Sequence, residues 1–428
     1  MKLKFRKKLF YKIHTWIGIK LSILFFIVCF SGTLATISHE LDWLFNPASR
    51  AIPQDTLASK NTVVANIKNE FPNAKTFSIF ASPEPYLCDI AQVYDNDQRY
   101  YVFTNQYTGE VQGKVNLTIQ RFFRDLHYYL FIPFQVGHFT VLFFGFILFI
   151  STVTACLFYK KWWKKLFTFK KGNEPVALFR CLHRLVGVWS VPFTILISIT
   201  GMWYFLERAN IGSISDTANP KRIVINEVEL DSISFSQIAY KLNYDRIVDA
   251  AEQAIPNLEV KDIIPPRGKT NTVYVTGKSD VPLVRNRANR VYIHPVTYEV
   301  LGVQNAKEIN TVTWLNDIAD PLHYGNFGGL FTKIIWFVGG LGISFLIGTG
   351  IFTSLKREIK NAKKAKTLHF GGWKYLNISL TVMMFWFMYK ALFYRYAINT
   401  NQFIIISLGW IIFFTLGWYI YVNKIKKL

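Results

Sequence analysis

Charged residues are scarce in this chain, and their scarcity excludes most water-soluble folds. Only 18% of the 428 residues are Asp, Glu, Lys or Arg, whereas 51% are hydrophobic and 17% are aromatic. Soluble domains carry about a quarter charged residues. A disordered chain or a collagen-like chain is excluded as well, because neither contains so much apolar surface. The composition therefore indicates that much of the chain lies in lipid.

Cysteine is also scarce, which excludes a disulfide-knit secreted module. Of the four cysteines, Cys29, Cys156 and Cys181 lie in or beside apolar runs, so Cys88 has no partner outside the membrane. The chain lacks a Cys-x-x-Cys-His motif, which excludes covalent c-type haem. It also lacks a Walker A motif and a Gly-x-Gly-x-x-Gly motif, so no sequence signal indicates a nucleotide site.

Acidic residues are almost missing from four segments that are rich in Lys and Arg. These segments are residues 1–13, 159–184, 355–374 and 423–428. They hold 24 basic residues and only Glu174 and Glu358, an excess that equals the net charge of +22. The rest of the chain is therefore balanced, which argues against nucleic acid as a partner. Each segment adjoins a long apolar run, so we expect all four in the cytoplasm.

Six apolar runs are each about 20 residues long, enough for a helix to cross a hydrocarbon core of about 30 Å. They are Thr15–Ile37, Val136–Tyr159, Leu185–Leu206, Leu330–Leu355, Tyr375–Tyr394 and Phe403–Val422. The first run is longer than the apolar part of a signal peptide, so we expect an uncleaved anchor. Six spans place both termini inside and the two long connections outside.

The first four spans are two copies of one unit. His14 and His183 open spans one and three, and each is followed 18 residues later by a glycine, Gly32 or Gly201. The offset between the copies is 169 for both pairs. Spans two and four also echo each other, so positions in one unit predict the environment of positions in the other. The echoed residues are His127 and His323, Gly145 and Gly340, and Thr154 and Thr349.

The two long connections carry mixed helix and strand signals. Helical stretches at Val63–Phe71 and Ile247–Ile255 each end at a proline. Alternating apolar residues with turn signals follow, and residues 101–111 and 290–300 predict closing hairpins at an offset of 189. We therefore expect two small α+β modules outside the membrane.

The predicted fold class is a polytopic α-helical membrane protein with six spans, an internal two-fold repeat and two outer α+β modules. Its parts are residues 1–37 with the N-terminal tail and span one, 38–135 with the first module, 136–206 with spans two and three around a basic loop, 207–329 with the second module, 330–355 with span four, and 356–428 with a cytoplasmic loop and the final hairpin.

Four of the eight histidines occupy repeated positions at two predicted depths. His14 and His183 lie at the inner face, and His127 and His323 lie at the outer face. Two imidazoles that face each other across a bundle suit a six-coordinate haem iron, because the porphyrin supplies the other four ligands. We therefore predict two six-coordinate haem irons, each with one axial histidine from each unit.

Residues beside these histidines fit the prediction. Gly18, Gly187 and Gly325 would let a flat macrocycle approach the backbone, and Asp125 and Asp320 could hold the outer imidazoles.

Other interpretations of the histidines stay open. Each could instead be a hydrogen-bonded interface residue that does not bind iron. His39 and His138 are alternative outer ligands, whereas His294 and His369 are expected in a solvated turn and a solvated inner loop.

Several short motifs together resemble one known family. They are the His-x-x-x-Gly openings, the Ser-Gly-Thr and Thr-Gly-Met span ends, the run Glu40–Pro47, the Leu-His pairs at 126–127 and 322–323, and the hairpin Thr108–Val111. Over about residues 5–357 the chain resembles the PepSY-associated transmembrane family, which includes iron-regulated inner-membrane proteins and siderophore-iron reductases.

The resemblance implies a bacterial inner-membrane b-haem protein with two periplasmic PepSY-like modules. Such a protein passes electrons outward and reduces ferric-siderophore or related ferric complexes for iron uptake. His14, His183, His127 and His323 fall on the histidine positions of the family. The chain has no flavin or nicotinamide domain, so a quinol or a cytoplasmic reductase would be a separate electron donor.

The chain departs from the family pattern in two places. Tyr298 stands where the first module has Gly109, and the final hairpin is an addition. A rival hypothesis is a non-enzymatic, membrane-anchored sensor or peptidase inhibitor with structural histidines. A transporter built from parallel repeats is disfavoured by the absence of discontinuous, Gly/Pro-broken helices with charges at mid-membrane.

Overall fold

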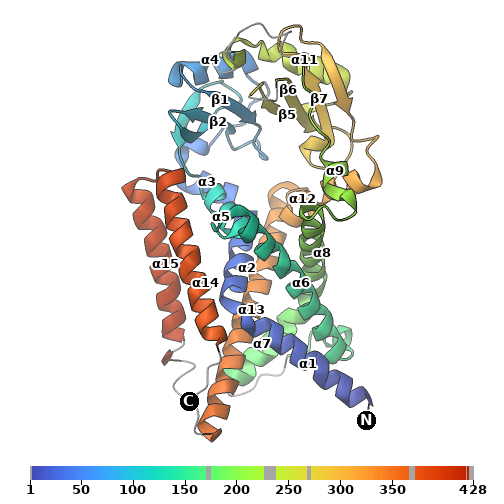
Figure 1. The fold of residues 1–428 in the computed structure, drawn as a ribbon, viewed down its shortest axis with the longest axis vertical. Helices are drawn as coiled ribbons and strands as arrows, with labels where there is room; N and C mark the ends of the chain where they lie inside the picture. The colour runs from blue at the N-terminus through green and yellow to red at the C-terminus, as the bar shows by residue number, and fades with distance from the viewer. Residues whose placement is uncertain are drawn as a thin grey trace. The chain divides into compact units, whose positions relative to one another are not determined.

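The computed structural model describes residues 2–169, 175–225, 238–267, 271–365, 372–420 and 422–423 (Figure 1). The chain divides into two compact units. The helical unit comprises Met1–Thr36, Phe123–Phe205 and Ile334–Leu428, and the sheet unit comprises Ile37–Phe122 and Leu206–Lys333. Each unit collects segments from both copies of the sequence repeat.

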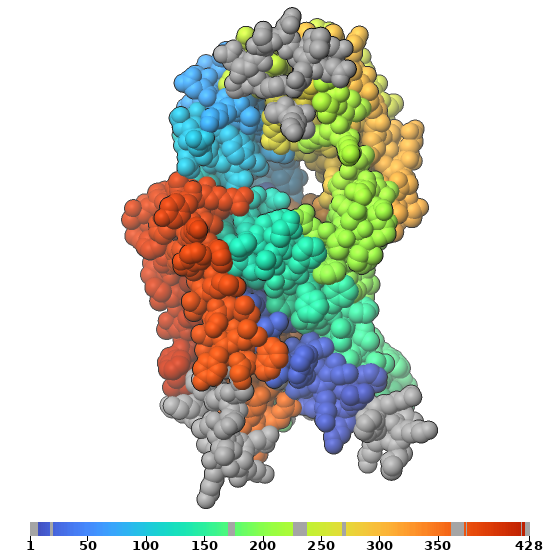
Figure 2. Space-filling view, viewed as in Figure 1, coloured from blue at the N-terminus to red at the C-terminus, as the bar shows by residue number. Residues whose placement is uncertain are grey.

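Among these described residues, four helices are long and apolar enough to span a membrane without a break. They are α6 (Phe134–Phe158), α13 (Gly329–Ala365), α14 (Trp373–Lys390) and α15 (Thr400–Ile420). The helix α13 continues ten residues beyond the predicted end of span four, because its basic extension consists mostly of good helix formers. The apolar stretch of α15 has no buried residue, and the hairpin lies at the surface of the helical unit (Figure 2).

The first and third spans are bent, which corrects the prediction of two unbroken helices. The helices α1 (Lys2–Lys20) and α2 (Ser22–Thr36) meet at 75°, and α7 (Pro175–Trp189) and α8 (Val191–Arg208) meet at 65°. In the part of the chain that the structure describes, four helices have the length and apolarity of a membrane span, or up to six if each bent pair is counted as one span. Because broken helices are present, their absence cannot be used against a transporter.

The two breaks obey the sequence repeat. They fall at Leu21 and Ser190, which are 169 residues apart, like His14 and His183. In the second copy Pro192 explains the break, because proline has no N–H to donate and its ring clashes with the preceding turn. Both candidate histidines thus lie on the short helix that precedes a break.

Glycines allow the spans to cross closely at equivalent positions. A Cβ atom at Gly145 of α6 would lie 3.2 Å from backbone atoms of Gly201 and Met202 in α8, and one at Gly340 of α13 would lie 2.5 Å from Oγ1 of Thr33 in α2. Met202 and Thr33 are related by the offset of 169. The same crossing is therefore used twice, and small residues permit the close approach that stabilises helix pairs in lipid.

The sheet unit contains one antiparallel sheet with the strand order β4-β3-β2-β1-β5-β6-β7-β8. The strands are β1 (Thr76–Phe80), β2 (Asp89–Asp95), β3 (Gln98–Thr104), β4 (Val111–Val115), β5 (Glu259–Ile264), β6 (Val273–Lys278), β7 (Asn289–Ile293) and β8 (Val300–Gln304). Each predicted module supplies four strands. The two sets join through the pairs Ile79 with Ile263 and Phe80 with Asp262.

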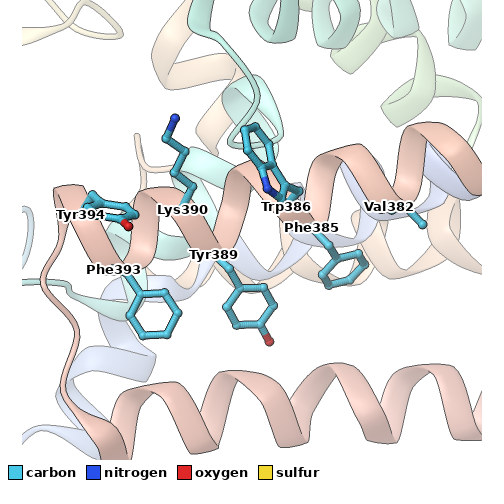
Figure 3. A pocket seen from close by; sticks show the side chains of 7 residues that line it. All are labelled: Val382, Phe385, Trp386, Tyr389, Lys390, Phe393 and Tyr394. Atoms are coloured by element: carbon cyan, nitrogen blue, oxygen red, sulfur yellow. The ribbon is translucent and has the colours of Figure 1, made fainter.

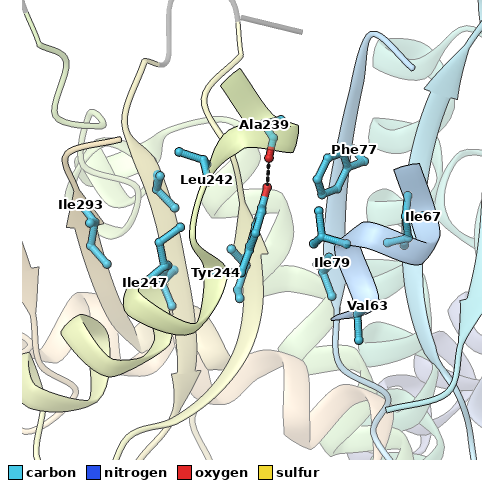
Figure 4. Packing of buried hydrophobic residues seen from close by; sticks show 14 of the residues in the cluster. Val63, Ile67, Phe77, Ile79, Ala239, Leu242, Tyr244, Ile247 and Ile293 are labelled. Atoms are coloured by element: carbon cyan, nitrogen blue, oxygen red, sulfur yellow. Dashed lines mark hydrogen bonds between the residues drawn. The ribbon is translucent and has the colours of Figure 1, made fainter. Parts of the chain in front are cut away.

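Two helices cover one face of this sheet (Figure 4). They are α4 (Lys60–Glu70) and α11 (Tyr244–Ala254), which end just before the two prolines, as predicted. The core between helices and sheet includes Ile67, Ile247 and Ile263, each at most 1% exposed. The hydroxyl of Tyr244 is also buried and donates to the carbonyl of Ala239 at 2.7 Å, which satisfies its polar group.

The turns of the two closing hairpins carry different residue types at the same repeat position. In the first turn Asn105 Oδ1 accepts the backbone N–H of Tyr107 at 2.9 Å, and in the second His294 Nδ1 accepts that of Val296 at 3.1 Å. His294 is buried, which corrects the expected solvated position. Tyr298 adopts a left-handed φ of 65°, close to the 79° of Gly109, so the turn keeps its shape without the glycine.

A buried carboxylate holds the helix that carries His127. Asp42 of α3 (Ser38–Phe45) accepts the backbone N–H groups of Ile119 and Gln120 at 2.7 and 2.9 Å, at the start of α5 (Ile119–Tyr129). Such a carboxylate at a helix N-terminus satisfies free N–H groups. Burial nevertheless raises the pKa of Asp42 to about 6, against the lowering effect of these two hydrogen bonds.

We expect this carboxyl group to make stability depend on pH. The folded protein holds the proton more tightly than the unfolded chain, whose pKa is near 3.8, so the stabilisation is complete below that value and is lost as the pH rises to about 6. The difference corresponds to at most about 3 kcal/mol. Thermal midpoints between pH 4 and 6.5 should fall more steeply for the wild type than for Asp42→Asn, and parallel curves would contradict the assignment.

Candidate functional site

The structure brings together two of the four predicted ligands. His14 of α1 and His183 of α7 belong to the helical unit, and their ring centres lie 6.3 Å apart with an angle of 75° between the planes. They occupy the same position in the two copies of the repeat. The ring of Phe158 packs edge-on against His14 at 5.4 Å. The pairing of these two histidines agrees with the prediction, whereas their role as ligands stays a prediction.

Each of these rings has one nitrogen held by the neighbouring span. His14 Nδ1 lies 3.0 Å from the carbonyl oxygen of Ser151, and His183 Nδ1 lies 2.8 Å from Oγ1 of Thr349. A carbonyl can only accept, and the Thr349 hydroxyl already donates to the carbonyl of Phe345. Both Nδ1 atoms therefore carry the proton, which leaves the lone pair on Nε2.

The ring separation suits one metal ion between two imidazoles. Imidazole nitrogen binds first-row metals at about 2.0–2.1 Å, so two opposite ligands place their nitrogens about 4 Å apart and their ring centres about 6 Å apart. The observed 6.3 Å agrees with this arrangement. Within the described ranges, no group of three or more His, Cys, Asp or Glu side chains could hold a bare metal ion.

His127 has a comparable environment in the helical unit. Its Nδ1 donates to the carbonyl of Val28 at 2.8 Å, and its ring covers Gly32, where a Cβ atom would lie 2.6 Å from Cε1. Burial lowers the pKa of His127, which keeps the imidazole neutral. Its predicted partner His323 lies at the end of α12 (Thr311–Tyr324) in the sheet unit, so the pair stays a prediction.

The alternative ligand His138 is buried in the helical unit. Its Nδ1 donates to the carbonyl of Tyr128 at 3.1 Å, and its ring stacks on Phe134 at 5.2 Å. The helix α5 ends at Tyr129 and α6 begins at Phe134, so the helix is interrupted between His127 and His138, as Pro133 predicts. The other alternative, His39, is half-buried on α3 in the sheet unit. His369 lies outside the described residues.

Two glycines missed by the sequence analysis contact the candidate histidines. Gly32 faces His127, and a Cβ atom at Gly350 would lie 3.7 Å from Cε1 of His183. Of the predicted glycines, Gly187 faces Leu346, and Gly325 ends α12 with a φ of 70°. The surroundings of Gly18 are outside the description. A search for glycines on facing spans, rather than beside each histidine, would have found the first two.

The two predicted supporting carboxylates form polar clusters of their own. Asp125 accepts the hydroxyl of Tyr129 at 2.8 Å and also that of Tyr396. Asp320 accepts Nη1 of Arg285 at 2.7 Å. Each aspartate therefore has a structural partner other than the histidine for which it was predicted, and the Nδ1 proton of His127 is held by a carbonyl oxygen instead.

Buried charges in the sheet unit were not predicted. Lys333 is 2% exposed, and its Nζ lies 2.8 Å from Glu40 and 2.9 Å from Glu84. A buried ammonium is tolerated only when it is paired in this way. Asp317 is fully buried and pairs with Arg285 at 2.6 Å. Both clusters join residues that are distant in the sequence, and we assign them a structural role.

An open groove runs along α14, but it carries little chemistry. Its volume is 770 Å³, and Lys390 is the one charged residue among the side chains that line it (Figure 3). The other lining residues are Val382, Phe385, Trp386, Tyr389, Phe393 and Tyr394. Apolar and aromatic side chains on a membrane-spanning helix are the surface that lipid covers.

Comparison with known proteins gives one finding about the whole chain. No curated protein matches it. A family model described as the PepSY-associated TM region matches residues 11–357, which contain both copies of the repeat and all four repeated histidines. The resemblance inferred from the sequence is thereby confirmed, and with the apolar helices it makes the chain a multi-pass membrane protein. The protein belongs to the PepSY-associated TM region family.

Proposed function

We propose that this protein is an inner-membrane b-type dihaem protein that carries electrons to ferric-siderophore or related ferric complexes in the periplasm. Both termini then lie in the cytoplasm, and the sheet unit lies in the periplasm. The electron donor is a separate quinol or cytoplasmic reductase. Reduction of Fe(III) to Fe(II) weakens the binding of iron by its chelator. The released iron is then available for uptake.

The observation that carries this proposal is the approach of His14 and His183 at 6.3 Å. Three features support it together. The rings come from equivalent positions of the two copies, both Nδ1 protons are held by neighbouring spans, and the ring centres lie at the separation expected of two imidazoles that share one metal ion. Two imidazoles are too few for a bare ion, but they complete the coordination of an iron that a porphyrin already holds by four nitrogens.

The chain's own residues orient and tune the site. When bound, haem iron supplies one-electron chemistry by cycling between Fe(III) and Fe(II). Ser151 and Thr349 hold the Nδ1 protons, which directs both Nε2 lone pairs away from the neighbouring spans and raises their basicity. Gly350 leaves space beside His183, and Phe158 packs against the ring of His14.

A second haem is proposed at His127, with His323 as its other ligand and His138 as the alternative. The observations on this chain that support it are the held Nδ1 proton and the close packing of the imidazole on Gly32. Two haems at different depths divide the membrane thickness into shorter electron steps. The sheet unit is proposed to receive the ferric complex.

The first test is the visible spectrum of the purified protein. We expect a sharp Soret band, split α and β bands after reduction with dithionite, and about two haems per chain. The rival hypothesis of a non-enzymatic sensor or peptidase inhibitor predicts a colourless protein. A colourless preparation from haem-replete cells would eliminate the reductase proposal.

The second test removes one proposed ligand. His183→Ala should lose about half of the haem, because one of two iron sites loses an axial bond. His294→Asn is the matched control, since the equivalent turn of the first module is built on Asn105. Pyridine haemochrome analysis measures the content, and equal content in the two variants would refute the role of His183.

The third test fills the space beside His127. In Gly32→Ala the new Cβ atom would lie 2.6 Å from the imidazole, so the ring must move. We expect loss of about one haem while the site at His14 and His183 survives. In the control Gly348→Ala the new Cβ atom meets its nearest neighbour, Phe26, at 3.8 Å, an ordinary contact. Full haem content in Gly32→Ala would exclude His127 as a ligand.

A further inference from the structure

The C-terminal hairpin contacts α1 and α5, the two helices of the first repeat copy that carry candidate histidines. It consists of α14, a π-helical turn at Ala391–Arg395, and α15, and it begins beyond residue 357, where the family match ends. All the contacts described below lie within the helical unit. They are made by two buried residues, Asn377 and Tyr396, and by their neighbours Trp373 and Arg395.

Asn377 reaches the helix that carries His14. This side chain is 6% exposed, and its Nδ2 donates to the carbonyl of Lys20 at 2.6 Å. Lys20 is the last residue of α1, just before the break, and the last carbonyls of a helix lack donors within their own helix. Beside it, the ring of Trp373 packs edge-on against Trp16, two residues after His14, at 6.2 Å. The end of α1 is thus held by α14.

Tyr396 reaches the helix that carries His127. It is 1% exposed, and its hydroxyl donates to the carboxylate of Asp125, two residues before that histidine. Tyr129, two residues after the histidine, donates to the same carboxylate at 2.8 Å and accepts Nη1 of Arg395 at 3.1 Å. The turn of the hairpin therefore holds α5 on both sides of its histidine.

The break in the second copy of the repeat has a different neighbour. Both breaks share one backbone hydrogen bond, from the N–H of Thr194 to the carbonyl of Ser190 at 2.7 Å and from that of Phe25 to Leu21 at 3.0 Å. Gly342 of α13 fills the adjacent space, since a Cβ atom there would lie 3.0 Å from Oγ of Ser190. The break after α7 thus packs against α13, one of the repeated spans, whereas the end of α1 is held by the added hairpin.

We propose that the hairpin is a positioning element for the first copy of the repeat. Asn377 sets the orientation of α1 and of His14, and Tyr396 sets the orientation of α5 and of His127. The proposal rests on the proposed function for the role of the two histidines as ligands. The division of labour between Asn377 and Tyr396 can be tested without haem.

The test compares three variants of the full chain by hydrogen–deuterium exchange. Tyr396→Phe should speed exchange in α5 about tenfold and leave α1 unchanged, because one buried hydrogen bond to a carboxylate is lost. Asn377→Leu should do the reverse. Tyr389→Phe is the matched control, because its hydroxyl bonds Ser407 of α15 at 2.9 Å and its side chain points toward the facing helix of the hairpin (Figure 3).

A redox titration of the same variants gives a second readout. Tyr396→Phe should shift only the midpoint potential assigned to the haem of His127, and Asn377→Leu only that of His14, with assignments taken from His127→Ala and His14→Ala. The control should shift neither midpoint.

The outcomes separate the two proposals. Equal exchange in all variants, or faster exchange in both helices for every variant, would overturn the positioning role even if the protein is red. If each variant speeds hydrogen–deuterium exchange only in its own helix but the protein is colourless, the positioning role is supported and the proposed haem function is contradicted. Selective exchange with unchanged midpoints would also overturn the proposal, because the helices would move without changing the ligands.

Discussion

The approach of two imidazoles from duplicated helices is the contact on which the rest of the helical unit depends. His14 and His183 approach each other from α1 and α7, the helices that precede the two breaks, while α6 and α13 supply the acceptors for their Nδ1 atoms. The glycine crossings at Gly145 and Gly340 pack the same two spans, α6 and α13, closely against α8 and α2. Each hydrogen bond contributes about 1 kcal/mol to stability, but its larger effect is to select one tautomer and one ring orientation.

Much of this arrangement follows from patterns that a sequence displays directly. A constant offset of 169 places the two histidines in equivalent environments, and long apolar runs locate the helices. The breaks were missed, because a bend leaves hydropathy unchanged. Only Pro192 offered a local signal for one of them. The glycines that face the histidines were missed because they lie on other spans, and facing spans are known only once the crossing is known.

The sheet unit also has features that the sequence pattern does not predict. Alternation and turn residues predicted the hairpins, but the pairing of β1 with β5 uses backbone hydrogen bonds between segments separated by nearly the whole repeat. Such pairing has no sequence signature of its own. His294 was placed correctly in a turn, yet its alignment with Asn105 at the offset of 189 already pointed to an acceptor role. Lys333 lies inside a predicted apolar span, and only its two glutamate partners explain its burial.

The central pairing of the sheet also bears on how the duplicated chain arose. Strands β1 and β5 each have partners on both sides, so only β4 and β8 remain as edges. A half-length ancestor with four strands would expose the edge of its first strand, and exposed edges invite another chain. Two copies of that ancestor could pair there with two-fold symmetry and form the same eight strands. Fusion into one polypeptide would then make permanent an association that had depended on protein concentration.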